Sequence, residues 1–180
     1  MSNSVLDNPD RYGAVSRSLH WGMAVLFLIQ FCSAAAHWGL PRENALREML
    51  WGYHTDVGLT LFLLVFLRGA WGLANMSRRP THPGALGRAA MAGHLAIYAL
   101  MIIVPSVRVL AAAGGTRGLS FWGIEVLQPR GQEVTWMQIP AEWHGEMGWL
   151  LAALILGHAG IALFWHGSIK RDGTLQRMVG

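Results

Sequence analysis

The sequence is poor in charge and nearly devoid of cysteine, and both deficits narrow the class of protein. Charged residues make up 13% of the 180 positions, whereas soluble domains carry about 25%. Together with 53% apolar residues, this shortfall favours a membrane protein formed as one domain over residues 1–180. The single cysteine, Cys32, lies in an apolar run, which excludes an intrachain disulfide framework and most thiolate metal sites.

Two further features are missing from the sequence. The 14 basic residues form no dense tract although the formal net charge is +4, so we do not expect binding to nucleic acid. The N-terminal region also lacks the apolar core of a signal peptide, because Asp7, Pro9, Asp10 and Arg11 fall within it. We therefore expect the first apolar run to remain as a membrane anchor.

Long apolar stretches are the main feature that is present. Four of them are long enough to cross a bilayer, which takes about 20 helical residues, and they cover residues 15–38, 50–73, 89–112 and 141–165. Each is predicted to be a helix, because backbone in lipid must satisfy its own hydrogen bonds. The gaps contain turn-forming residues, namely Pro41, Pro80, Pro83 and the Gly114–Gly115 pair. The predicted fold is an all-α membrane protein, a bundle of four transmembrane helices.

The flanking charges predict the orientation of this bundle. With four helices, both termini and the middle loop share one side, which carries Arg11, Arg17, Arg78, Arg79, Arg88, Lys170, Arg171 and Arg177. The opposite side carries fewer basic residues, namely Arg42, Arg47, Arg117 and Arg130. Basic residues favour the cytoplasmic side, so the sequence predicts that both termini lie in the cytoplasm. The loop over residues 114–140 is expected to lie against the opposite membrane surface.

Histidine is unusually frequent within these apolar stretches. Among the eight histidines, we single out five that lie in or at the edges of the predicted helices: His20, His54, His94, His144 and His158. An ionisable residue inside a membrane is costly and indicates a functional site by default. The structural alternative is that each histidine forms a hydrogen bond to a neighbouring helix, which becomes less favourable when several occur at paired depths.

The spacing of these histidines predicts two pairs. His144 and His158 are 14 residues apart on one helix, which separates them by roughly 21 Å along the axis and only about 40° around it. His20 enters its helix near the cytoplasmic boundary, at the depth of His158. His54 begins its helix near the opposite boundary, at the depth of His144. We therefore expect His20 to pair with His158, and His54 with His144.

Two imidazoles at each level predict a haem whose iron both histidines ligate, rather than a zinc site. Zinc usually takes four ligands, or three and a water molecule, and no Cys, Asp or Glu at matching depth completes such a set. Two trans histidines suit haem iron, and helical bundles commonly hold such cofactors. The absence of a C-x-x-C-H motif predicts non-covalent, b-type haem. Ligation by two histidines leaves no open iron position and favours electron transfer.

Three further residues are candidates for cofactor binding. Arg68 lies 14 residues after His54, and Arg108 lies 14 residues after His94, so each arginine reaches one haem level and can pair with a propionate. The alternative for both is snorkelling to the interface. His94 is expected to donate a hydrogen bond to a propionate or a quinone. Near the ligands, Gly58, Gly145, Gly148 and Gly157 leave room for a macrocycle or serve ordinary helix packing.

These residues belong to an ordered set of motifs that covers nearly the whole chain. Through them the sequence resembles the bacterial cytochrome b561 family. The matching segments are Arg11-Tyr12, Ser18-Leu19-His20-Trp21, His54 with Gly58 and Arg68, His94-Leu95-Ala96-Ile97-Tyr98 with Pro105, Ser120-Phe121-Trp122-Gly123, Trp143-His144-Gly145-Glu146, His158 with His166, and Lys170-Arg171-Asp172-Gly173-Thr174-Leu175. The sequence departs from the family pattern at Arg108 and Trp165.

The resemblance implies two b haems, one ligated by His20 and His158 and the other by His54 and His144. It also implies electron exchange with membrane quinone, and some similar proteins are superoxide oxidases that reduce ubiquinone. The leading hypothesis is therefore an oxidoreductase that carries electrons across the inner membrane from a periplasmic donor such as superoxide to ubiquinone. Arg108, Arg117 or Arg130 would attract the anion, and His166, Arg17 and Lys170 are candidate proton donors or quinone contacts.

Two other classes of function remain open. The protein is alternatively a cytochrome subunit that passes electrons between the quinone pool and a partner redox protein, which would dock on the outer loop. A carrier of haem or isoprenoid is the third class, and paired ligands at both levels argue against it because a carrier must release its cargo.

Overall fold

The computed structural model describes residues 4–79 and 84–179. Within these ranges, four helical stretches are long and apolar enough to cross a membrane: Ala14–Gly39, Ala45–Ala74, Gly87–Gly114 and Thr135–Lys170. The prediction of a four-helix membrane protein is therefore confirmed. Pro80 and Pro83, which we expected to separate the second and third spans, lie outside the described residues.

The first two spans consist of three helices. Helix α1 covers Ala14–Gly39, α2 covers Ala45–Gly52 and α3 covers His54–Ala74. The second span thus begins earlier than the predicted residue 50. The reason is local, because the Asn44 side chain accepts hydrogen bonds from the N–H groups of Leu46 and Arg47 and so caps a separate short helix.

The second half of the chain contains one long helix and one composite helix. Helix α4 covers Gly84–Gly114 and contains Pro105. The fourth span is built from α5 (Thr135–Gln138), the 3₁₀ turn η2 (Ile139–Trp143), α6 (His144–Gly160) and the π-helical segment η3 (Ile161–Lys170). A short 3₁₀ helix, η1 (Met76–Arg78), follows α3, and α7 (Gln176–Val179) ends the described chain.

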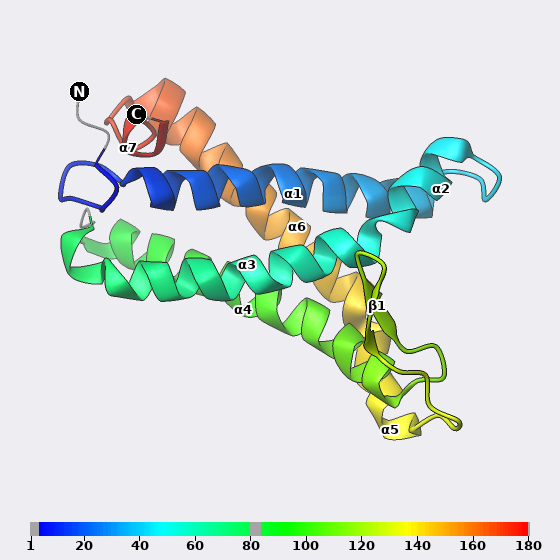
Figure 1. Ribbon diagram of the computed structural model, residues 1–180. Helices are drawn as coiled ribbons and strands as arrows, with labels where there is room; N and C mark the ends of the chain where they lie inside the picture. The colour runs from blue at the N-terminus through cyan, green and yellow to red at the C-terminus, as the bar shows by residue number, and fades with distance from the viewer. Residues whose placement is uncertain (1–3, 80–83, 180) are drawn as a thin grey trace.

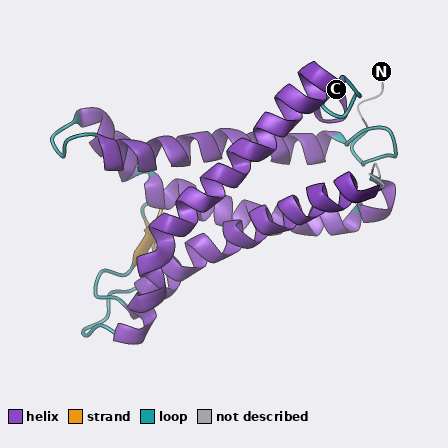
Figure 2. Ribbon diagram, turned by 180° about the vertical axis from the view of Figure 1, so that it is seen from behind, coloured by secondary structure: helices purple, strands orange, loops and turns teal. Residues whose placement is uncertain are grey.

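The helices pack as two antiparallel pairs that meet in the middle of the molecule. Helix α1 contacts α3, α4 contacts α6, and α3 contacts α4. Figure 1 shows the two termini at one end of the bundle, here called the terminal end, with α2 and the β-strands at the other end, here called the hairpin end. Figure 2 shows α6 and η3 crossing the bundle diagonally as one continuous rod. This rod, like α1, α3 and α4, therefore runs between the two ends.

A small β-hairpin is the feature that an all-helical prediction did not include. Strands β1 (Leu119–Phe121) and β2 (Ile124–Leu127) pair antiparallel. Trp122 and Gly123 form the turn with φ of 46° and 80°, the left-handed geometry of a two-residue hairpin. The Trp122 N–H donates to Asp56 Oδ1 at 2.7 Å, and its indole N–H donates to Thr60 Oγ1 at 3.2 Å. These bonds fix the hairpin against α3.

The apolar core lies where the four spans meet. Its buried members are Met23, Phe27, Val57, Leu61, Val65, Met101 and Leu151. Large apolar side chains also cover the outside of the spans, such as Leu28 at 65% exposure and Leu156 at 70%. Exposed apolar side chains on helices long enough to span a membrane indicate that the outer face of the bundle contacts the lipid bilayer.

Asp7 fastens the N-terminal segment to the loop that follows α3. Its side chain is fully buried, and it accepts hydrogen bonds from the Gly13 N–H at 2.8 Å and from Arg79 Nε at 3.0 Å. Burial by itself raises the pKa of Asp7, but hydrogen bonds from Ser16, Gly13 and Arg79 outweigh it and hold the pKa below its usual value. The carboxylate is thus stabilised in its charged form.

We expect Asp7→Asn to lower thermal stability in detergent by about 2 kcal/mol, the usual contribution of hydrogen bonds to a charged group. Because the folded pKa is depressed, this contribution is complete above the unfolded pKa of about 4 and disappears as the pH falls through the folded pKa. Thermal unfolding of both proteins between pH 7 and pH 3 measures it. Asp10→Asn, at an exposed position, is the control. If the difference in stability between Asp7→Asn and the parent protein were the same at every pH, the prediction would be contradicted.

Candidate functional site

The terminal end brings three of the predicted histidines together. His20 on α1 and His158 on α6 have ring centres 6.2 Å apart, with ring planes at 84°. His94 on α4 lies beside them, with its ring centre 4.9 Å from that of His158. The sequence assigned His94 to neither pair, and the fold places it beside this one. We call His20 and His158 the terminal-end pair.

Arg68 lies against this pair, at the level that its spacing from His54 predicted. Its Nη1 donates to His20 Nδ1 at 3.0 Å, and its Nε donates to the Tyr98 hydroxyl at 2.8 Å. Both bonds hold the guanidinium inside the bundle. The Arg68 side chain therefore points to His20 and Tyr98 and does not snorkel to the interface.

The hairpin end brings together the other predicted pair. His54 is the first residue of α3 and His144 is the first residue of α6. Their ring centres are 6.3 Å apart, with ring planes at 75°. Arg108 lies on α4, and its side chain is exposed. We call His54 and His144 the hairpin-end pair.

Hydrogen bonding fixes which nitrogen of His54 carries the proton. The Ser33 hydroxyl donates its single proton to the Gln30 carbonyl at 2.7 Å, so its oxygen accepts from His54 Nδ1 at 2.7 Å. The lone pair of His54 is therefore on Nε2, where the Gln30 amide nitrogen approaches to 3.1 Å. The buried Gln30 Oε1 has no hydrogen-bond partner among the described residues.

His144 has the same tautomer. Its Nδ1 lies 2.9 Å from the Val104 carbonyl oxygen, which can only accept, so Nδ1 carries the proton and Nε2 carries the lone pair. Metal-bound histidines typically donate the second ring N–H to a carbonyl or another oxygen in this way. Both members of the hairpin-end pair are thus prepared to coordinate through Nε2.

His20 has the opposite tautomer. Arginine only donates hydrogen bonds, so a bond from Arg68 to His20 Nδ1 leaves the proton of the neutral ring on Nε2. Coordination through His20 Nε2 therefore requires the proton to move to Nδ1 and Arg68 to turn to another acceptor. The two pairs differ in this respect although their spacings are nearly equal.

The spacing of both pairs fits a metal ion held between two trans imidazoles. With each coordinating nitrogen about 2 Å from the metal, the two ring centres lie roughly 6 Å apart. The measured spacings are 6.2 and 6.3 Å, whereas the 4.9 Å between His94 and His158 is too short. Among the described residues, no group of three or more His, Cys, Asp or Glu side chains forms a metal site. The donor set thus suits haem iron, whose other ligands come from the porphyrin.

Glycines near the pairs leave space rather than packing against other helices. A Cβ added at Gly145, Gly148 or Gly157 would meet no atom of another described element within 4 Å. At Gly58 it would lie 3.1 Å from the Gln30 amide nitrogen. Close helix packing therefore does not explain the three glycines of α6, and space beside the backbone is what a flat macrocycle needs.

The remaining candidates lie at two separate places. At the terminal end, Asp172 Oδ2 accepts from His166 Nδ1 at 2.8 Å and from Lys170 Nζ at 3.1 Å, whereas Arg17 bonds the Val179 carbonyl at 3.3 Å. Hydrogen bonds from the Thr174 side chain, His166 and Lys170 hold the pKa of Asp172 well below its usual range despite some desolvation.

The two arginines of the long loop do not join a histidine pair. Arg117 is exposed, and Arg130 Nε donates to the Ala113 carbonyl at 2.6 Å.

Four residues at the hairpin end were not found from the sequence: Gln30, Ser33, His37 and Trp51. His37 stacks on Trp51, and Trp51 stacks on His54. The available signal was polarity, since Gln30, Ser33 and His37 are one or two helical turns apart within an apolar run and so face the same way.

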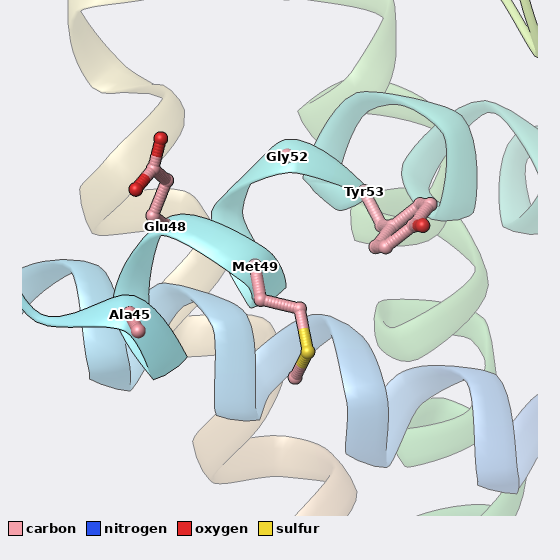
Figure 3. Close-up of a pocket in the computed structure, with 5 residues that line it drawn as sticks. All are labelled: Ala45, Glu48, Met49, Gly52 and Tyr53. Atoms are coloured by element: carbon pink, nitrogen blue, oxygen red, sulfur yellow. The ribbon is translucent and has the colours of Figure 1, made fainter.

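A shallow groove on the second span lies apart from the histidine pairs. Figure 3 shows its lining residues, with Met49 extending towards α1 and Glu48 pointing the opposite way. The groove is lined by Ala45, Glu48, Met49, Gly52 and Tyr53. The groove is open, and no histidine lines it.

Comparison with known proteins agrees with this description. The profile of a family described as prokaryotic cytochrome b561 matches residues 11–180. Cytochrome b561 homolog 2 of Escherichia coli (strain K12) is 24% identical, over 98% of this chain and 95% of its own length. Cytochrome b561 homolog 1 of the same organism is 24% identical, over 94% of this chain and 97% of its own length.

Proposed function

Since the chain belongs to the prokaryotic cytochrome b561 family, and so is a membrane cytochrome of b type in electron transfer, we propose that it holds two haems. His54 and His144 would bind one of them, and His20 and His158 the other. The observation that carries this proposal is the spacing of the two imidazole pairs, 6.3 and 6.2 Å, at opposite ends of one bundle.

When bound, the two haems supply one-electron redox centres without an open iron position. The four imidazoles are partly buried in the bundle, and α6 carries one member of each pair. An electron accepted at one end would then be delivered at the other. We propose that the hairpin end faces the periplasm and the terminal end the cytoplasm, because basic residues are concentrated at the terminal end. The membrane would then be the bacterial inner membrane.

Arg68 and Tyr98 would adjust the terminal end to its cofactor. Arg68 must release His20 Nδ1 for that nitrogen to carry the proton, and its Nε bond to Tyr98 keeps the guanidinium in place meanwhile. A propionate is the acceptor that suits a guanidinium best. Arg108 is the corresponding cation at the hairpin end. His94 donates through Nδ1 to the Ala90 carbonyl at 2.7 Å, so its Nε2 accepts, and the hydrogen bond we expected it to donate would require the other tautomer.

We infer that the donor is superoxide and the acceptor is ubiquinone. Each superoxide gives up one electron and leaves as dioxygen, and ubiquinone takes two electrons and two protons to become ubiquinol. Arg108, Arg117 and Arg130 would attract the anion to the hairpin end. At the terminal end, His166 and Lys170 share the Asp172 carboxylate, and they would supply protons from the cytoplasm. Arg17 would contact the quinone beside them.

The test is to add superoxide pulses to the purified, oxidised protein. We expect the reduced haem spectrum to appear, and ubiquinol to accumulate at about one per two superoxide added when ubiquinone is present. Superoxide dismutase added first serves as the control and should abolish both signals. A haem spectrum that stays oxidised would reject superoxide as the donor while leaving haem binding unaffected.

A second candidate function is that of a cytochrome subunit which exchanges electrons with a partner redox protein. The observation in its favour is the exposed apolar surface of the hairpin, where Trp122, Ile124 and Val126 are 54%, 69% and 55% exposed. Such a surface suits a partner protein as well as a membrane surface. Copurification of a redox protein that is lost on Ile124→Ser would favour this alternative.

A further inference from the structure

A stack of three aromatic rings leads away from the hairpin-end pair. The His37 ring lies on Trp51 with ring centres 3.6 Å apart and planes at 19°, and Trp51 lies on His54 at 4.5 Å and 27°. The three residues come from the end of α1, from α2 and from the start of α3. Rings this close and this nearly parallel overlap face to face, so the stack is a continuous π contact.

Hydrogen bonds hold both ends of the stack. Arg47 donates through Nε to the His37 carbonyl at 3.2 Å and through Nη2 to His37 Nδ1 at 3.1 Å. At the other end, Ser33 accepts from His54 Nδ1 at 2.7 Å. Each face of the Trp51 ring contacts a histidine ring that hydrogen bonds hold in place. Rotation of Trp51 would break both contacts. Contacts from α1, α2 and α3 therefore determine the position of the Trp51 ring.

The stack connects the hairpin-end pair with the polar end of the bundle. The Trp51 side chain is 41% exposed, whereas His54 is partly buried. The helix that carries Trp51 also contains Arg47 and Glu48, and charges of both signs place this helix at the aqueous boundary. An electron donor in water thus reaches Trp51 more closely than it reaches His54.

We propose that electrons enter the protein at the hairpin end through this stack, passing from Trp51 to His54 while His37 holds the other face of Trp51. The proposal rests on the proposed function, because it requires haem iron between His54 and His144. A small one-electron reductant would dock against Trp51 and transfer one electron to ferric iron, which becomes ferrous. Trp51 supplies orbitals that overlap those of His54 and is not itself oxidised, and no proton is transferred. Trp51 acts through His54 and is a positioning residue.

The alternative is that the stack only packs α2 against the bundle. To separate the two roles, the experiment uses a His20→Ala/His158→Ala background, in which reduction of the remaining haem takes place only at the hairpin end. Trp51→Leu removes the ring, and Trp51→Phe restores one. Trp38→Leu is the matched control, since Trp38 is 84% exposed on the same helix end as His37. Haem content and midpoint potential are measured for each variant before kinetics.

The probe is dithionite, whose reactive species, the sulfur dioxide radical anion, gives up one electron. In Trp51→Leu we expect the second-order rate constant for haem reduction to fall about tenfold, a change of about 1.4 kcal/mol in activation free energy. Trp51→Phe should restore most of the rate, Trp38→Leu should not alter it, and the midpoint potential should be equal in all variants.

Two results would overturn this proposal, and a third would overturn its premise. A Trp51→Leu protein that keeps its haem and is reduced at the parent rate excludes the path. A slower haem reduction accompanied by a lowered midpoint potential would mean that Trp51 only packs α2 against the bundle and does not carry electrons. A background protein that binds no haem would instead contradict the proposed function, and with it the path.

Discussion

A His144→Ala protein is expected to carry one haem where the parent protein carries two. His144 supplies one of the two imidazoles at the hairpin end, and its lone pair on Nε2 is fixed by the bond from Nδ1–H to the Val104 carbonyl. Alanine removes an iron ligand, and the remaining ligand, His54, does not hold haem tightly alone. The measurement is the haem content per chain together with the reduced-minus-oxidised spectrum of the purified protein.

The control for this variant is His166→Ala. His166 also lies in the fourth span, but its Nδ1 bonds Asp172 at the terminal end, so both haems should remain. His54→Ala is expected to behave as His144→Ala does. If His144→Ala still held two haems with unchanged spectra, the assignment of the hairpin-end ligands would be wrong.

The second large effect is expected from His158→Ala, which should abolish quinone reduction and leave the donor reaction intact. The hairpin-end haem keeps both imidazoles and should still be reduced by superoxide. Ubiquinol formation should fall to the background rate, because the terminal end no longer holds the redox centre that delivers the electron. Stopped-flow reduction of haem and the yield of ubiquinol are measured on the same sample.

His94 has to be included in this experiment. Its ring centre lies 4.9 Å from that of His158, and it is the nearest imidazole to take the place of the lost ligand. The double variant His158→Ala/His94→Ala removes that substitute, whereas His94→Ala alone should keep two haems. Ubiquinol formation at the parent rate in the double variant would show that electrons leave the protein by another route.

Much of the candidate site follows from one-dimensional spacing. A helix rises 1.5 Å per residue, so the 14 residues between His144 and His158 set two levels in the bilayer whatever their neighbours are. The predicted partners His20 and His54 do lie beside these histidines, and Arg68 lies at the predicted level. Their roles as ligands of haem remain predictions that the variants above test.

Other features depend on contacts between distant segments and could not be read from spacing. The hairpin at residues 119–127 forms on α3 because Asp56 and Thr60 bond Trp122, whereas the sequence of the loop suggested only a surface segment. Similarly, α2 begins at Ala45 because Asn44 caps it. The hydropathy of residues 45–49 alone does not indicate a helix boundary.

The sequence by itself determined that the chain spans a membrane with four helices and that its histidines occur at two depths. Bilayer thickness and helical rise are fixed lengths, so apolar run length and residue spacing are sufficient for both conclusions. Only the tertiary structure decided the tautomers of His54, His144 and His20, and the stack of His37 on Trp51 and His54. These depend on how each helix is rotated and how closely the helices approach, and packing between helices sets both.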